Sequence, residues 1–136
     1  MKKRFFWLMC AAIALIIGAI LYGLYRQDTY VGKIVGIALG KPLQVNSAFS
    51  ACMAYYLPDF LWMFALVCSL LTVMLPRGKH MLFWCLFAFL LGTLWELLQL
   101  WGVVPGTADV HDVILYSMAA ITAAIISSLK KRRKTR

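Results

Sequence analysis

The side chains of this 136-residue chain that could do chemistry are mainly its five carboxylates and a few polar neighbours. Glu96 and Gln99 stand three residues apart, so their side chains share one face of a helix. Asp109 and Asp112 have the same spacing. Carboxylates grouped with an amide suit the binding of a cation, a lipid headgroup or a glycan. The pattern therefore predicts a ligand-binding site, with the candidate residues Glu96, Gln99, Asp112, Asp109, Asp59, Thr107 and His111.

Glu96 is the residue on which this prediction depends most. It lies about one turn inside the end of an apolar segment, where an ionised carboxylate costs several kcal/mol unless it is paired, hydrated or protonated. No basic residue stands at a comparable depth in any apolar segment. The remaining candidate partners are Gln99, Thr107, His111, backbone amides, water or a proton. We therefore expect Glu96 to face the interior of a helical bundle or an aqueous pocket.

The same residues also have structural explanations. Three of the acids stand at helix starts, where N-capping and the helix dipole favour a carboxylate in any case: Asp59, Asp109 and Asp112. Glu96 and Gln99 could instead tie two helices together by hydrogen bonds. His111 is expected as an exposed interface residue rather than as a ligand. The sequence does not decide whether a metal ion binds, and no cofactor is expected.

The elements that must position these residues are membrane helices. The chain is 63% hydrophobic and only 14% charged, with a mean hydropathy of +0.82, which excludes an ordinary water-soluble domain. Crossing a membrane takes about 20 apolar residues. Four segments have that length, at about 5–25, 57–75, 81–101 and 110–129. The sequence predicts an all-α membrane protein of four transmembrane helices, forming one domain over residues 1–136.

The connection at 26–56 contains an apolar segment that is too short to cross a membrane alone. It begins near Tyr30, carries Lys33 and Lys41, and is followed by the helix-stop pattern of Gly40 and Pro42. It predicts a short interfacial or re-entrant helix, with a β-hairpin as the weaker alternative. Asn46 or Ser47 is expected to cap a second short helix before Pro58.

The basic residues predict the orientation, because Lys and Arg are retained on the cytoplasmic side. Eleven lie in the N-terminus, the second loop and the tail 130–136, against three in the connection: Arg26, Lys33 and Lys41. Both termini are therefore expected in the cytoplasm, with the five carboxylates, Asp28 included, on or near the outer side. The basic tail is interpreted as a membrane anchor that contacts lipid headgroups, not as a nucleic-acid site.

Small residues predict how the helices pack, because close approach in lipid requires small side chains. Ala119, Ala123 and Ser127 recur at every fourth position in the last segment, and Ala14 with Gly18 do so in the first. The pattern predicts both segments at the centre of a compact bundle, and the alternative is that small residues are simply common in such helices. The cysteines have no CxxC spacing and no His at metal-ligand spacing, and are interpreted as small buried hydrophobic residues: Cys10, Cys52, Cys68 and Cys85.

The stretch WELLQLWGVVPGTADVHDVILYSMAA, residues 95–120, resembles the VanZ-like family of small bacterial membrane proteins. In that family a Glu-x-x-Gln ends one helix and an Asp begins the next, and the matching positions here are Glu96, Gln99, Thr107 and Asp112. Three positions depart from the family pattern of Arg, Asn and Gly: Gly106, Tyr116 and Ala119. The resemblance covers about the last two spans. It implies a bacterial plasma-membrane protein linked to glycopeptide resistance or envelope stress.

Two functions follow from these features. The first is binding of a headgroup, glycan or cation in an outward-facing acidic pocket. The alternative is a non-catalytic interaction subunit that docks a larger membrane partner. An enzyme is less favoured, because no nucleophile and base have a recognisable spacing and His80 and His111 are expected on opposite sides of the membrane. A proton-coupled transporter is also less favoured, because one buried acid supplies no path through the inner half.

Overall fold

The computed structural model describes residues 2–76, 80–105 and 107–132, and within these ranges it is helical with no strand. The elements are α1 (Lys2–Tyr25), α2 (Tyr30–Leu39), α3 (Ala48–Ala51), the π-helical turn η1 (Cys52–Tyr56), α4 (Leu57–Met74), α5 (His80–Leu100) and α6 (Val110–Arg132). Four helices are long and apolar enough to cross a membrane, counting α3, η1 and α4 as one. The predicted class of all-α protein with four such helices is confirmed, as expected of a multi-pass membrane protein.

The second of these helices begins earlier than the sequence indicates. The Ser47 side chain caps α3 in a reciprocal capping box with Ser50, as expected for one of the two candidate caps. The helix then continues through η1 into α4 instead of stopping before Pro58. Proline lacks an N–H and its ring crowds the preceding turn, and a π-helical turn accommodates both. The two predicted helices are therefore one, Ala48–Met74.

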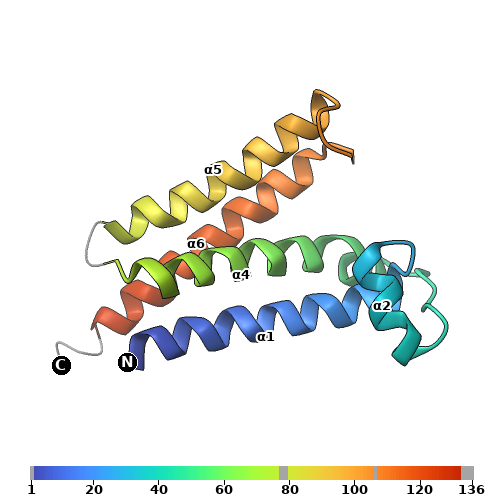
Figure 1. The fold of residues 1–136 in the computed structure, drawn as a ribbon, viewed down its shortest axis with the longest axis horizontal. Coiled ribbons are helices and arrows are strands. Elements are labelled where there is room, and N and C mark those ends of the chain that lie inside the picture. Colours follow the sequence, from blue (N-terminus) through green and yellow to red (C-terminus); the bar gives the residue numbers. More distant parts are fainter. Residues whose placement is uncertain (1, 77–79, 106, 133–136) are drawn as a thin grey trace.

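The long helices are arranged as two pairs. Figure 1 shows α1 beside α4, and α5 beside α6, with the pairs converging at the end where the chain begins and diverging toward the other end. Helix α4 contacts α1, α5 and α6, whereas α1 is close only to α2, η1 and α4 among the described elements. The prediction that the first span lies at the centre is wrong, because α4 occupies that place.

The apolar core lies toward the end of the bundle where the chain begins. Ala119 and Ala123 of α6 are fully buried against a cluster that includes Val67 and Cys68 of α4. These small side chains let α6 approach α4 closely, as predicted for the last span. Large apolar side chains cover the outward faces of the helices, for example Leu86 of α5, as a lipid environment requires.

Helix α2 packs crosswise on the end of α1 through glycines. Thr29 caps its first turn by accepting from the backbone N–H of Gly32, and Gly40 ends it with a φ of 85°. Gly32 and Gly36 are buried against the residues that follow α1. The amide of Gln27 bonds the carbonyl of Gly40 at 2.6 Å. The predicted short helix and its stop at Gly40 are confirmed.

We expect the substitution Gly32→Ala to release α2 from α1. A Cβ at this position would collide with the backbone carbonyl of Arg26, which no rotamer change can relieve, and would lie 2.8 Å from the Thr29 hydroxyl. Overpacking of this kind costs about 1–3 kcal/mol. Amide hydrogen exchange in α2 should accelerate while α4 is unaffected. Unchanged exchange in α2 would show that the glycine does not hold the helix in place.

Candidate binding site

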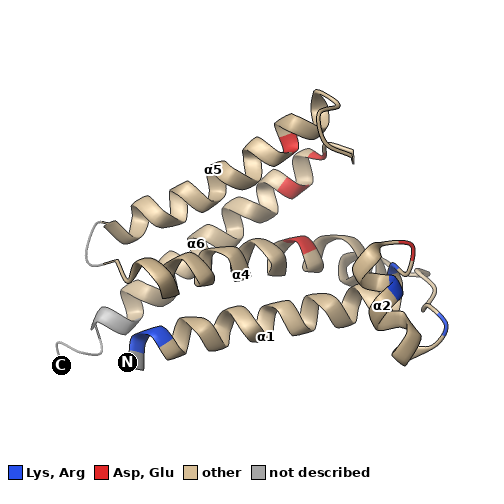
Figure 2. Ribbon diagram, in the orientation of Figure 1, with Lys and Arg blue, Asp and Glu red and all other residues tan. Residues whose placement is uncertain are grey.

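All the described carboxylates lie at one end of the bundle, which we term the acidic end. Figure 2 shows them at the end of α5, the start of α6, the first turns of α4 and the turn after α1, with Lys3 and Arg4 at the opposite end. Asp28, in the turn after α1, is exposed. The other four come together in three dimensions. The basic loop residues Arg77 and Lys79 and the tail from residue 133 lie outside the described residues.

Glu96 is the buried member of this group, with only 5% of its surface exposed. Its Oε1 accepts a hydrogen bond from the hydroxyl of Tyr116 at 2.8 Å, and its Oε2 accepts from the backbone N–H of Asp109 at 3.2 Å. Tyr116 belongs to α6 and Asp109 directly precedes that helix, whereas Glu96 is on α5. The carboxylate therefore joins the two helices at the acidic end.

Gln99 completes the surroundings of the Glu96 carboxylate. The amide fits best when its nitrogen donates to Glu96 Oε2 at 3.1 Å and its oxygen accepts from the indole Nε1–H of Trp95 at 3.2 Å. Glu96 thus has three protein donors and no cation at ion-pair distance within the described residues. A buried carboxylate with this many donors is well stabilised by the fold alone. The geometry of the Glu96 carboxylate suits a role in positioning α5 and α6.

Asp109 and His111 form a separate unit at the start of α6. Asp109 Oδ1 accepts from the backbone N–H of His111 at 2.9 Å and lies 2.7 Å from its ring Nδ1. The backbone hydrogen bond, followed by the contact with the ring, lowers the pKa of Asp109 below its usual value. The His111 ring also faces Tyr56 at 5.9 Å between centroids. His111 therefore pairs with Asp109 and not with Glu96.

Asp59 and Asp112 are the half-buried carboxylates of the cluster. Asp59 on α4 accepts a long hydrogen bond of 3.4 Å from the hydroxyl of Tyr22 on α1. Asp112 on α6 accepts no hydrogen bond from any described residue. The two lie within electrostatic range of each other, of Glu96 and of Asp109. Acids from α4, α5 and α6 are thus gathered at the acidic end, where the helix pairs diverge.

Arg26 is the cation that acts on this cluster, although its position in the sequence predicts only a flanking charge. Its guanidinium carbon lies 5.3 Å from the ring centroid of Tyr22 and 5.6 Å from that of Tyr55, both within cation–π range. It is in electrostatic range of Asp59 and Asp112 without reaching either at ion-pair distance. Tyr22 thus contacts both the cation and an acid.

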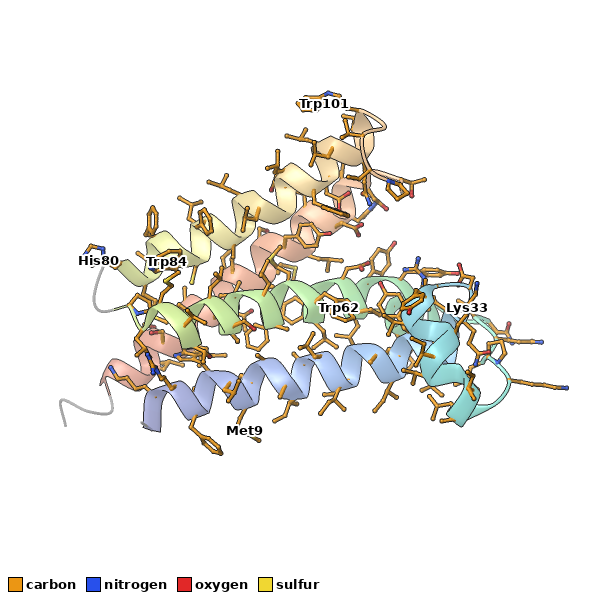
Figure 3. All side chains as sticks on the ribbon, viewed as in Figure 1. Met9, Lys33, Trp62, His80, Trp84 and Trp101 are labelled. Atoms are coloured by element: carbon orange, nitrogen blue, oxygen red, sulfur yellow. The ribbon has the colours of Figure 1, made fainter. Side chains whose placement is uncertain are left out.

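Thr107 is the candidate residue that takes no part in these hydrogen bonds. Thr107 is exposed and forms no hydrogen bond with a described residue. His80 begins α5 at the opposite end of the bundle (Figure 3), so the two histidines lie far apart as expected. Cys68 and Cys85 are buried and Cys10 is half-buried, but Cys52 is exposed. The prediction of buried cysteines is wrong for that one.

Other chemistries find little support in the described residues. No three His, Cys, Asp or Glu side chains among them are grouped so that they could hold a metal ion. An apolar groove of about 370 Å³ runs between α5 and α6 and is lined by Phe83, Phe89, Ala120 and their neighbours. These residues lie toward the other end of the two helices, so the groove is not part of the acidic cluster.

The fold and the cluster define a class: a small helical protein with four membrane-length helices and a group of carboxylates gathered at one end of the bundle. Searches of protein-family models, curated proteins and solved structures find no match to this chain.

Proposed function

We propose that the protein is a VanZ-like integral membrane protein of the bacterial cell envelope that binds a positively charged group at the acidic end. The ligand is a lipid headgroup or glycan that carries an amino group, or a small cation. The connection with glycopeptide resistance or envelope stress rests on the resemblance of residues 95–120 to that family.

The observation that carries this proposal is the charge imbalance of the cluster. Four carboxylates interact with one another, and Arg26 is the one cation acting on Asp59 and Asp112. The contact of His111 with Asp109, an ion pair only when the ring is protonated, is the only contact of this kind within 4 Å in the described part of the chain. Carboxylates held close together repel one another and favour any cation that can reach them. The cluster therefore selects a positively charged ligand.

The four acids have different roles in this proposal. Glu96 is buried and already accepts three hydrogen bonds, so it positions α6 against α5. Asp112 is half-buried and has unused acceptor capacity, and Asp59 of α4, with one weak donor, lies within electrostatic range of it. These two carboxylates are the proposed ligands for the incoming cation. Asp109 is occupied by His111 and shapes the edge of the site.

The proposed orientation has both termini in the cytoplasm of the bacterial plasma membrane and the acidic end outside. It is supported by Lys3 and Arg4 at the end opposite the carboxylates and by the basic residues expected in the tail. An outward acidic end would meet headgroups and envelope glycans directly.

We expect a cationic ligand to stabilise the wild-type protein and not the variant Asp112→Asn. Binding at about one hundred times Kd stabilises a fold by roughly 2.7 kcal/mol, which corresponds to a melting shift of several degrees. Melting in detergent would be followed against MgCl2, glucosamine and dihexanoyl phosphatidylethanolamine in turn. The ligand that raises the melting temperature identifies the class.

The matched control for this experiment is Asp28→Asn, which removes an exposed carboxylate at the same end of the bundle. It should respond to the ligand as the wild type does. If all three proteins respond alike, the cluster does not bind the ligand. A wild type that responds to no probe, but that purifies with one stoichiometric membrane protein, would favour the alternative of an interaction subunit.

A further inference from the structure

The outward face of α2 carries large side chains that are mostly exposed. Tyr30, Ile34 and Ile37 stand at positions i, i+4 and i+7 and form one stripe along the helix. Their exposed fractions are 81%, 56% and 88%. The stripe lies opposite Gly32 and Gly36, which are buried against the residues that follow α1. Because the glycine face of α2 is packed against the protein, the apolar stripe points away from it.

The depth of α2 follows from the residues on which it packs. Gly23, in the last turn of α1, is in contact range of Val35 and Leu39 of α2, and Gly36 is packed on Gln27. All of α2 from Gly32 onward thus lies at the level of residues 23–27. Because α1 is a membrane-length helix that ends at Tyr25, this level is that of the lipid headgroups.

The charges around the stripe are basic. Lys33 lies on the exposed part of α2 beside Ile34 and Ile37, and Lys41 is exposed just after the helix (Figure 3 labels Lys33). Asp28, in the turn before the helix, is the one acid beside it, and no acid occurs from residue 29 to 58. A short helix with an apolar stripe and flanking lysines has the composition of segments that lie on anionic membrane surfaces.

We propose that α2 is a lipid-binding element that lies in the membrane surface at the acidic end and selects anionic phospholipid. Tyr30, Ile34 and Ile37 insert at the boundary between headgroups and acyl chains. Lys33 and Lys41 reach the phosphate layer, as long basic side chains do from the ends of such segments. The position of α2 at a single level of α1 favours this interfacial arrangement over a re-entrant one, in which the helix would extend along the inside of the span.

The position also favours lipid over a protein as the occupant of the stripe. The stripe is at headgroup level on a chain whose neighbouring faces are themselves apolar, for example Ile20 of α1. Lipid would cover both surfaces without a break. The lysines supply the charge complementarity to an anionic leaflet. The proposal does not depend on ligand binding by Asp112.

Hydrogen exchange of the full chain in lipid nanodiscs tests this proposal. Discs of phosphatidylcholine would be compared with discs that contain about one third phosphatidylglycerol. A ten-residue helix is marginal on its own, so its amide exchange reports how firmly it is anchored. We expect exchange in α2 to be slower in the anionic discs, by about five-fold for each lysine that reaches the surface.

Three variants make the result specific. The double variant Lys33→Gln/Lys41→Gln should lose the difference between the two lipids. Ile37→Asn should speed the exchange of α2 in both, with the core of α4 unchanged because Ile37 contacts no core residue. Lys3→Gln/Arg4→Gln removes the same charge at the opposite end and should behave as the wild type.

Two outcomes would overturn the proposal. Equal exchange of α2 in the two lipids, with no effect of the lysine substitutions, would show that anionic lipid is not recognised. Slow exchange that appears only in discs loaded with two copies of the chain would assign the stripe to self-association instead.

Discussion

Replacing Glu96 by alanine should cost this protein about 3 kcal/mol of unfolding free energy. The change leaves the Tyr116 hydroxyl, the Asp109 N–H and the Gln99 amide without their acceptor. An unsatisfied donor costs about 1–3 kcal/mol when it is buried, and water that reaches the exposed Asp109 would recover part of the sum. Glu96→Gln should cost less, about 1–2 kcal/mol, because it keeps one acceptor oxygen. Reversible unfolding in mixed detergent micelles measures both values.

Two further variants distinguish the loss of a hydrogen bond to Glu96 from the loss of a negative charge at this end of the bundle. Tyr116→Phe removes a single donor and should cost about 1 kcal/mol. Asp28→Asn removes an exposed carboxylate at the same end and should stay within about 0.5 kcal/mol of the wild type. If Glu96→Ala were no more harmful than Asp28→Asn, the carboxylate would not be what joins α5 to α6.

The part of this architecture that could be predicted from sequence is the part governed by local composition. Runs of apolar residues identify the four long helices, since nothing else at this length buries so much apolar surface. The helix caps predicted from local residue types are also confirmed, with Ser47 as the N-cap of α3 and Gly40 as the C-cap of α2. The shared face of Glu96 and Gln99 follows from helix periodicity, and the structure brings their side chains together.

The errors arose where tertiary packing or proline accommodation decided the outcome. Pro58 suggests a helix start, but a π-helical turn can carry a helix through a proline, and sequence periodicity does not reveal such a turn. Ala14 and Gly18 could have placed α1 centrally. They instead serve its contact with α4 alone, where Gly18 faces Leu61. Small residues indicate close packing without indicating the number of partners.

The aromatic and cationic members of the site were also missed. Tyr116 stands twenty residues after Glu96, and Tyr22 stands thirty-seven before Asp59, so their hydrogen bonds depend on how helices pair. Arg26 was counted only as a flanking charge, although it lies over two tyrosine rings. An available signal was the position of Tyr116 on the same helix face as Asp112, four residues earlier.

The second large effect is expected at Gly92, which is buried where α4, α5 and α6 meet. An alanine Cβ there would collide with the Cε of Met63 and lie 2.8 Å from Cδ2 of Tyr116. Methionine can move away, but the tyrosine ring is held by its bond to Glu96. We expect Gly92→Ala to destabilise the fold by about 1–3 kcal/mol, although alanine is the better helix former. Unfolding in mixed micelles measures the difference.

Gly18→Ala is the matched control, because Gly18 is also a buried helical glycine. Its alanine Cβ would lie 3.8 Å from the nearest atoms of Leu61 and Trp62, an ordinary contact, so stability should be unchanged or slightly higher.

A double-mutant cycle then tests whether Gly92→Ala destabilises the fold through the hydrogen bond of Tyr116 with Glu96. If Gly92→Ala pushes Tyr116 off Glu96, then Tyr116→Phe should cost less in that background than in the wild type. Additive losses would show that the clash is absorbed by Met63 and that the hydrogen bond between the helices survives.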